Sequence, residues 1–309
     1  MAAAVKIFSS SLIACAVLSL TSTSIAQSDR VSADKPLILV TGITGNQGGA
    51  VARELGRRGF PVRGLSRDIE QPESIALTES GIEMVQGDFN DPESVRRAAE
   101  GVHGMFLVLP QTWQAEEEVR MGTDTIEAAI AAGVKHLVYS SSGAGHPVDG
   151  FPGAAKMQIG RYLSESGAPY TIVMPGTFME GLLPTERQQD ILENGYGDGQ
   201  GAEARTEFVA LEDVGFIVGE IFDEPDQWLG VAQHLAGDSL SGTELAAIFS
   251  KVSGRDIEFR VTEPPFWMMG MQEWMQQQAD VGPEVAALRE RYPRLSTLEE
   301  FLREHRWGH

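Results

Sequence analysis

The chain is poor in cysteine and in basic residues. Its 309 residues include one cysteine, Cys15, and 24 Lys and Arg against 44 Asp and Glu, which gives a formal net charge of -20. A single thiol excludes a disulfide within the chain and a metal site built from several cysteines. The negative charge argues against nucleic acid as a partner, because the phosphate backbone attracts basic surfaces. We interpret the acidity as favouring solubility.

Histidine is also scarce, and its spacing does not predict a metal site. Zinc ligands commonly come in pairs only a few residues apart. Only His305 and His309 lie that close, and a structural or surface role is the better interpretation for each of the six histidines, which are His103, His136, His146, His234, His305 and His309. The sequence likewise lacks an internal repeat and a low-complexity tract, so a solenoid or a long linker is not expected.

The first 26 residues are predicted to be a secretory signal peptide. Lys6 is the only charged residue before Asp29, the run Ile7–Leu20 is apolar or small, and Ser24-Ile25-Ala26 fits a cleavage site. The run is too short for a comfortable membrane span, so the mature form is expected to have no integral span. Leu12–Cys15 also resembles a lipoprotein box. We rank that alternative second because the apolar run continues beyond it. Residues 27–35 are polar and predict a flexible lead-in.

The most informative segment is a glycine turn between an apolar run and a helical pattern. Residues 37–40 are Leu-Ile-Leu-Val, and Gly-x-x-Gly-x-x-Gly follows at Gly42, Gly45 and Gly48. In a dinucleotide site the first glycine permits a tight turn, the second lets the backbone approach the pyrophosphate, and the third lets the helix pack on the strand. The first N–H groups of the helix then point at the anion. We predict dinucleotide binding by these glycines with Thr44, Asn46 and Gln47, although Asn46 could instead cap the helix.

The rest of the chain predicts an α/β fold of the Rossmann type. Short apolar runs alternate with helical periods, which is typical of a doubly wound parallel sheet. The expected strands are Leu37–Thr41, Pro61–Ser66, Ile82–Gln86, Gly104–Leu109, His136–Ser140 and Tyr170–Met174. The expected helices are near Gly48–Arg58, Pro92–Ala99, Ala115–Ala132 and Ala154–Ser166. Helix ends are indicated by Gly59, Asp91, Gly101 and Gly133.

After Pro175 the pattern changes, and a smaller, mostly helical C-terminal region is expected. We place the dinucleotide-binding domain at 36–178 and the substrate-side region at 179–309, with some segments of the latter returning to the sheet. Residues 176–201 are rich in Gly, Pro and polar residues and predict loops. Further elements are expected at Phe208–Ala210, Leu211–Phe222, Gly230–Ala236 and Ser241–Val252, and as helices within 264–306 that are interrupted at 282–283 and 292–293.

The end of the second expected strand indicates which cofactor is bound. Sites that prefer NAD(H) place an acidic residue there to accept from the ribose hydroxyls. This chain has Ser66 and Arg67 instead, and a guanidinium fits a 2′-phosphate through paired hydrogen bonds. Arg63 is expected to add positive field, whereas Asp68 opposes it. We therefore expect NADP(H) to be preferred over NAD(H).

Taken together, these residues resemble the NmrA-like group of atypical short-chain dehydrogenases/reductases. The resemblance rests on the stretches Thr41–Gly48, Val62–Asp68, Gln86–Asp91, Gly101–Leu107, Lys135–Ser142, Ser166–Ile172 and Pro175–Glu180. It implies a dinucleotide-binding protein, either an NADPH-dependent reductase of quinones, dyes and phenolic compounds or a sensor of redox state. It also implies that Arg67 selects NADP and that Asp88 and Phe89 contact the adenine. Asp88 could alternatively shape a turn.

The catalytic residues implied by the resemblance are incomplete. Ser141 or Ser142 ends the fifth strand, and Lys156 follows in a helix. The tyrosine that usually donates the proton four residues before this lysine is replaced by Pro152. Tyr139 and Tyr162 do not substitute for it on spacing grounds. Lys156 is thus expected to bind the cofactor ribose and is a candidate for proton transfer, with a solvated surface lysine as the alternative. Further departures from the family pattern, which concern the substrate pocket, are Gly160, Met174 and Gly181.

The leading hypothesis is hydride transfer from NADPH to a small quinone-like or aromatic acceptor. The alternative is a dinucleotide-binding sensor without turnover, which the missing tyrosine favours, and an isomerase is a weaker third. The soft, aromatic stretch 265–275 could cover a flat substrate, but we favour a core role. Two of these predictions conflict, since the signal peptide indicates export whereas dinucleotide cofactors are cytosolic molecules. The protein is expected to be exported, periplasmic or secreted, if the signal peptide is genuine and cytoplasmic if the start site is misassigned.

Overall fold

The computed structural model describes residues 35–112, 114–142, 153–197, 201–263 and 282–309, all of which belong to one compact unit, Val31–His309. The predicted signal peptide, the aromatic stretch 265–275 and Pro152 lie outside the described residues. Within the described part, no helix is long and apolar enough to cross a membrane.

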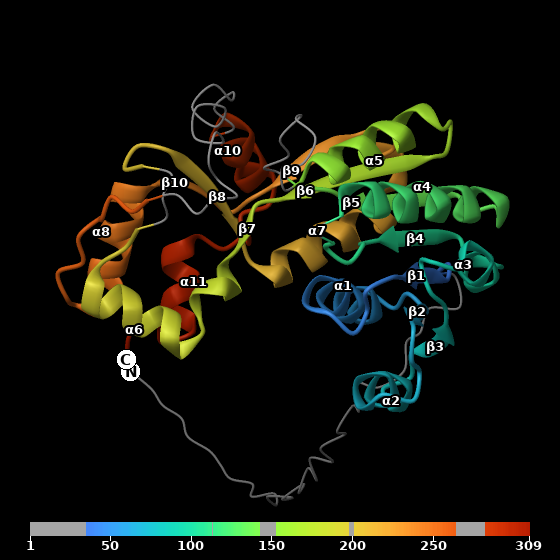
Figure 1. The fold of residues 1–309 in the computed structure, drawn as a ribbon, viewed down its shortest axis with the longest axis horizontal. Coiled ribbons are helices and arrows are strands. Elements are labelled where there is room, and N and C mark those ends of the chain that lie inside the picture. Colours follow the sequence, from blue (N-terminus) through green and yellow to red (C-terminus); the bar gives the residue numbers. More distant parts are fainter. Residues whose placement is uncertain (1–34, 113, 143–152, 198–200, 264–281) are drawn as a thin grey trace, which may run out of the picture. The chain divides into compact units, whose positions relative to one another are not determined.

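A seven-stranded parallel sheet forms the centre of the molecule (Figure 1). Its strand order is β3-β2-β1-β4-β5-β6-β9, and every neighbouring pair is parallel. The strands are β1 (Ile38–Val40), β2 (Val62–Ser66), β3 (Glu83–Gln86), β4 (Gly104–Leu107), β5 (His136–Ser140), β6 (Tyr170–Pro175) and β9 (Ala232–Leu235). The predicted Rossmann-type fold is confirmed, and all seven strands match expected segments to within two residues at each end.

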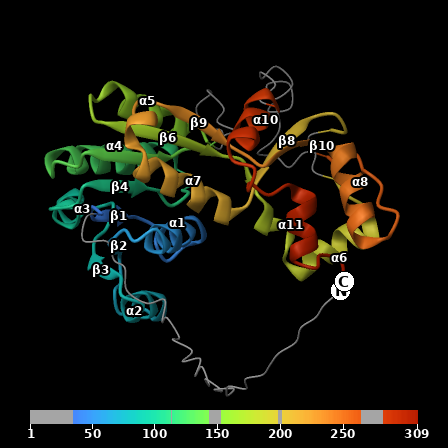
Figure 2. The ribbon, with the colours of Figure 1, turned by 180° about the vertical axis from the view of Figure 1, so that it is seen from behind.

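Helices cover both faces of this sheet, because successive residues of a buried strand point to opposite sides. Ile38 and Val40 of β1 belong to the core cluster beneath α1 (Asn46–Arg57) and α7 (Leu211–Asp223). Leu39 belongs to the cluster beneath the other helices, which are α3 (Pro92–Ala99), α4 (Ala115–Ala131) and α5 (Ala154–Glu165). Figure 2 shows α1 and α7 side by side from behind. All five helices match expected ones.

The C-terminal region combines helices with a small second sheet. Strands β10 (Asp238–Ser241), β8 (Arg205–Val209) and β7 (Thr177–Phe178) lie in that order, with β10 antiparallel and β7 parallel to β8. The helices are η1 (Met179–Leu182), α6 (Thr185–Asn194), η2 (Pro225–Gln227), α8 (Gly242–Ser253), α10 (Gly282–Arg291) and α11 (Leu298–Glu304). A separate core cluster, which includes Leu245, Phe249 and Trp307, packs among them.

One expectation about this topology was wrong, and one helix was not expected. Residues 176–201 were expected to form loops, yet they contain η1 and α6. Helix α6 buries only Ile191, so its polar sequence carries no apolar period to reveal it. Helix α2 (Pro72–Glu79) was missed for the same reason, since Ser74 is its only buried residue.

The expected helix ends are confirmed. The Asp91 side chain accepts a hydrogen bond from the Ser94 N–H at the start of α3, and Ser241 forms a capping box with Glu244 at the start of α8. The three glycines that follow helices have positive φ, namely Gly59, Gly101 and Gly133. These local signals fix where the helices begin and end.

Candidate functional site

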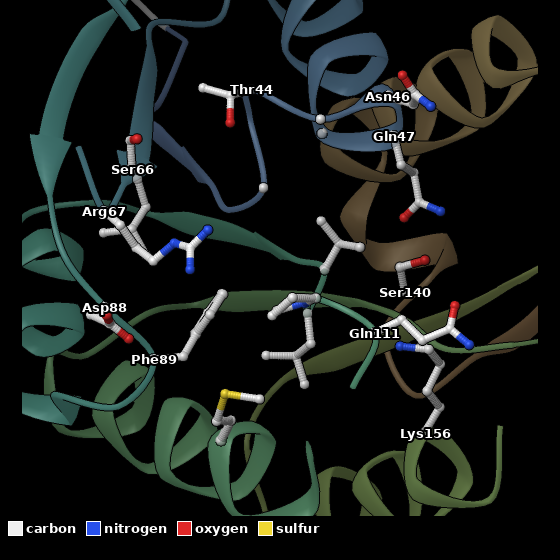
Figure 3. Close-up of a pocket in the computed structure, with 18 of the residues that line it drawn as sticks. Thr44, Asn46, Gln47, Ser66, Arg67, Asp88, Phe89, Gln111, Ser140 and Lys156 are labelled. Atoms are coloured by element: carbon white, nitrogen blue, oxygen red, sulfur yellow. The ribbon is translucent and has the colours of Figure 1, made fainter. Parts of the chain in front are cut away.

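A cavity of about 790 Å³ lies at the carboxyl ends of the parallel strands. Its wall combines the turn after β1, the ends of β2 to β6 and the start of α5, and Figure 3 shows the labelled side chains around it. All the residues predicted to bind cofactor or to act in catalysis line it, namely Gly42, Thr44, Gly45, Asn46, Gln47, Gly48, Arg67, Asp88, Phe89, Ser141, Ser142 and Lys156. Ligands bind at this edge of open α/β sheets.

The turn that leaves β1 has no room for a side chain at Gly42 or Gly48. Gly42 has φ of 60°, a conformation that favours glycine. A Cβ atom on Gly48 would lie 2.3 Å from the Gly42 carbonyl oxygen, so α1 packs directly on the turn. The Thr41 hydroxyl donates to the Val108 carbonyl at 2.9 Å and accepts from the Val108 N–H at 2.9 Å. These contacts hold the turn against the end of β4.

The N-terminus of α1 is uncapped. Gly45 is the N-cap residue, and no side chain accepts from the first-turn N–H groups. Asn46 is the first helical residue, so the alternative that it caps the helix is wrong. No acidic residue occupies the first turn, so the positive end of the helix dipole faces the cavity without local neutralisation. In addition, the Oε1 atom of Gln47 is buried and has no partner among the described residues.

Arg67 supplies a positive charge at the end of the cavity formed by β2 and β3. Its side chain is exposed, points into the cavity in Figure 3, and has no ion pair among the described residues. Asp68 forms no ion pair with Arg67 among the described residues, and its carboxylate accepts a hydrogen bond from the Glu70 N–H at 2.9 Å. Arg67 is therefore available to an anionic ligand.

Arg63 does not add to this positive field, which corrects the expectation. It points away from the cavity, where its guanidinium donates to the carbonyls of Ala98 at 2.9 Å and Glu100 at 2.8 Å. It also forms a 3.0 Å ion pair with Glu83. The charge of Arg63 is thus neutralised on the far side of the strand.

Asp88 and Phe89 line the same end of the cavity, after β3. The Asp88 carboxylate accepts from the Asn90 N–H at 2.8 Å, and its carbonyl accepts from the Asp91 N–H at 2.9 Å. The turn-shaping role of Asp88 is confirmed. The phenyl ring of Phe89 offers the cavity an apolar face.

Lys156 lies at the opposite end and is not a solvated surface lysine. Its Nζ is 2.7 Å from Oε1 of Glu118, with side-chain exposures of 17% and 6% respectively. The hydroxyls of Tyr139 and Ser141 each donate to the Lys156 carbonyl at 3.3 Å. Figure 3 places Lys156 near Gln111 and Ser140 and far from Arg67.

Neither tyrosine replaces the missing acid. Tyr139 is fully buried, and burial together with Glu118 raises its pKa. The Tyr162 hydroxyl donates to the Glu127 carboxylate on the protein surface. Among the described residues, no tyrosine lines the cavity. The described part of the chain also holds no group of acidic, histidine or cysteine side chains suited to a metal ion.

The positions that depart from the family pattern, Gly160, Met174 and Gly181, do not line this cavity. Sequence reasoning missed three residues that matter there. Gln111 and Met121 line the wall, and Glu118 lies behind Lys156. Glu118 belongs to a run of three glutamates, 116–118, on an expected helix, and only packing distinguishes it from its neighbours.

A doubly wound parallel sheet with a glycine turn, an uncapped helix N-terminus and a cavity at the strand ends defines a Rossmann-type dinucleotide-binding fold. A family model agrees with this geometry over residues 34–302, and the chain belongs to the NmrA-like family. The resemblance stated from the sequence is confirmed.

Two relatives are named as reductases. The NAD(P)H azoreductase of Xenophilus azovorans is 31% identical over 230 residues, which cover 72% of this chain and 76% of the relative. The (4-alkanoyl-5-oxo-2,5-dihydrofuran-3-yl)methyl phosphate reductase of Streptomyces griseus is 33% identical over 229 residues, with the same coverage of 72% and 76%.

Solved structures confirm the fold. NmrA, described as a negative transcriptional regulator, in complex with NADP has a TM-score of 0.71 at 22% identity, covering 87% of this chain and 95% of its own. It was also solved with NAD. The NADPH-dependent quinone oxidoreductase QOR2 of Escherichia coli, in complex with NADPH, has a TM-score of 0.69 at 23% identity, with coverage of 86% and 99%.

Proposed function

We propose that this protein is an NADPH-dependent oxidoreductase that reduces a small quinone-like or aromatic acceptor. The observation that carries the proposal is one cavity that is lined by a glycine turn, by Arg67, which has no ion pair among the described residues, and by Lys156, which forms a partly buried ion pair. The names of the two reductases above, which include an azoreductase, support a reductase rather than another use of the fold.

The residues present fit a nicotinamide dinucleotide. The turn from Gly42 to Gly48 leaves backbone bare where a pyrophosphate would approach, and the uncapped start of α1 offers N–H groups to it. Asp88 and Phe89 would border the adenine. Lys156 and Ser141 would border the ribose of the nicotinamide at the other end. The bound cofactor supplies the hydride, while the protein holds the ring in place and excludes water.

The preference for NADP(H) rests on Arg67. A guanidinium without a protein partner can form paired hydrogen bonds to a 2′-phosphate, and its charge counters the protein's net charge of -20. The solved NmrA complexes with both NAD and NADP leave the family's preference open. The preference of this chain for NADP(H) is therefore inferred from its own side chains.

An apolar wall supports a flat acceptor. Leu109, Pro110, Met121 and Phe178 line the cavity beside the polar end that contains Gln111 and Lys156. Pockets for small organic ligands are mostly apolar with few polar groups. The acceptor would lie against this wall, with its polar atoms toward the polar end.

A second function is favoured by one observation. Among the described residues no tyrosine lines the cavity, and the usual position is Pro152. A protein that binds the dinucleotide but lacks an acid could act as a redox sensor, as NmrA's description as a regulator suggests for a related fold.

Titration and turnover separate these functions. The full chain is titrated with NADPH and NADH by nucleotide fluorescence, and NADPH oxidation is then followed with a panel of quinones, azo dyes and triphenylmethane dyes. Steady turnover that falls in Lys156→Ala supports the oxidoreductase. Tight NADPH binding with no turnover on any acceptor supports the sensor, and absence of binding to either nucleotide contradicts both.

A further inference from the structure

The ion pair between Glu118 and Lys156 is the most enclosed charged contact at the cavity. Glu118 lies in the first turn of α4, its side chain is 6% exposed, and it does not line the cavity. Lys156, on α5, does line it. The ammonium group therefore lies between a buried carboxylate on one side and the ligand space on the other.

This arrangement fixes the lysine at both ends. Its backbone carbonyl accepts hydrogen bonds from the Tyr139 and Ser141 hydroxyls of the β5 segment. Its ammonium group donates to Glu118 at 2.7 Å, and α4 packs against α5. An unpaired lysine chain is flexible and pays rotamer entropy for each contact it makes. Here the direction of the charge is set before a ligand arrives.

A lysine ammonium has three N–H donors, and Glu118 uses one. Among the described residues no other group is seen to accept from the remaining donors, which can meet a ligand in the cavity. A buried Glu118 carboxylate without a partner would be energetically costly, and this cost favours the state in which Lys156 stays paired with it. A fixed donor toward the cavity suits a ligand with vicinal hydroxyls, such as a ribose.

We propose that Glu118 is a positioning residue that aims Lys156 at the nicotinamide ribose of the bound cofactor, at the end of the cavity opposite Arg67. The proposal rests on the function proposed above. It assigns Glu118 no direct contact with cofactor or substrate, because the lysine separates it from the cavity.

The first test uses two ligands that share the phosphorylated adenosine, of which only one reaches the Lys156 end of the cavity. NADPH carries the nicotinamide ribose, whereas adenosine 2′,5′-bisphosphate carries the 2′-phosphate without it. Glu118→Gln should weaken NADPH binding about tenfold, the scale of one charge-assisted contact, and leave adenosine 2′,5′-bisphosphate binding unchanged. Glu116→Gln is the matched control. It removes the same charge from an exposed position in the same helical turn, and both affinities should stay at the wild-type value.

A double-mutant cycle shows whether Glu118 acts through the lysine. In a Lys156→Met background, Glu118→Gln should change NADPH affinity less than twofold, because the contact it supports is already gone. The double variant also removes both buried charges together, which is tolerated better than removing one. It therefore gives a folded reference if Glu118→Gln alone is unstable. Glu118→Asp keeps the charge and should restore part of the NADPH affinity that Glu118→Gln loses.

The outcomes are distinct. Wild-type protein that binds neither ligand overturns the proposed function and this inference with it. Wild-type protein that binds both, with Glu118→Gln weakening the two ligands equally, overturns only the positioning role and indicates a folding defect. A tenfold loss that persists in the Lys156→Met background overturns it as well.

Discussion

Replacing Arg67 with alanine should weaken NADPH binding about 30-fold and leave NADH binding within twofold of the wild type. Arg67 has no ion pair among the described residues and points into the cavity, so its removal costs the folded protein little. Charge-assisted hydrogen bonds to a phosphate contribute about 2 kcal/mol at a partly exposed site, which corresponds to the stated change in Kd.

Arg63→Ala is the matched control, since it removes the same charge from the same strand segment. Arg63 is only 15% exposed and contacts Ala98, Glu100 and Glu83. Its loss should lower the free energy of unfolding by about 2 kcal/mol and Tm by about 4 °C. The ratio of NADPH to NADH affinity should not change, because Arg63 does not line the cavity.

The assay is fluorescence titration of each variant with both nucleotides, together with thermal unfolding. The two arginines should show opposite effects, with Arg67→Ala changing nucleotide selectivity and Arg63→Ala changing stability. Equal weakening of NADPH and NADH by Arg67→Ala would refute the selectivity argument. A loss of selectivity in Arg63→Ala would show that the overall field, rather than a directed contact, favours NADPH.

Four further substitutions test the geometry. Gly48→Ala places a Cβ atom 2.3 Å from a backbone oxygen, so it should destabilise the protein by about 1–3 kcal/mol and weaken NADPH binding. Gly56→Ala has nothing within 4 Å of the added Cβ and should stabilise the protein by about 0.5–1 kcal/mol. Chemical denaturation that gives the two variants equal stability contradicts the packing argument. Burial lowers the pKa of His136 from 6.5 to about 4, so the unfolded chain takes up this proton first as pH falls. The contribution of neutral His136 to the free energy of unfolding is complete above pH 6.5 and is lost toward pH 4, a change of about 3 kcal/mol. A His136→Leu variant should lack this part of the pH dependence. A plot of its stability against pH that runs parallel to that of the wild type argues against a role for His136. Tyr139→Phe should keep turnover within twofold and cost about 1 kcal/mol of stability, whereas a large loss of kcat would identify Tyr139 as the missing acid.

Much of the fold could be predicted because its signals are local. Buried parallel strands are short apolar runs, and glycine, proline and capping residues mark where helices begin and end. Helices α2 and α6 escaped because they bury almost nothing, and a helix without an apolar stripe has no period to detect. In the small second sheet, the element expected at Phe208–Ala210 overlaps β8, whereas β7 and β10 escaped because they are short and mostly polar.

The cofactor end of the site was also predictable. The residues that would hold the pyrophosphate follow one another along the chain, since a turn and a helix start are made by neighbours in sequence. Arg67 follows a predicted strand directly. The direction of its side chain relative to Arg63 was not predictable, because β2 ends at Ser66 and the alternation that orients Arg63 does not extend to Arg67.

The sequence by itself determined the glycine turn, the parallel sheet, the position of Arg67 directly after a strand and that of Lys156 near the start of a helix. These follow from backbone sterics and from the period of apolar residues, which operate over a few neighbours. Only the tertiary structure decided that Arg63 turns away to Glu83 and that Glu118, among three adjacent glutamates, pairs with Lys156. Those outcomes depend on how α4 packs on α5 and how β2 lies beside β3, and such contacts join residues that are far apart in the chain.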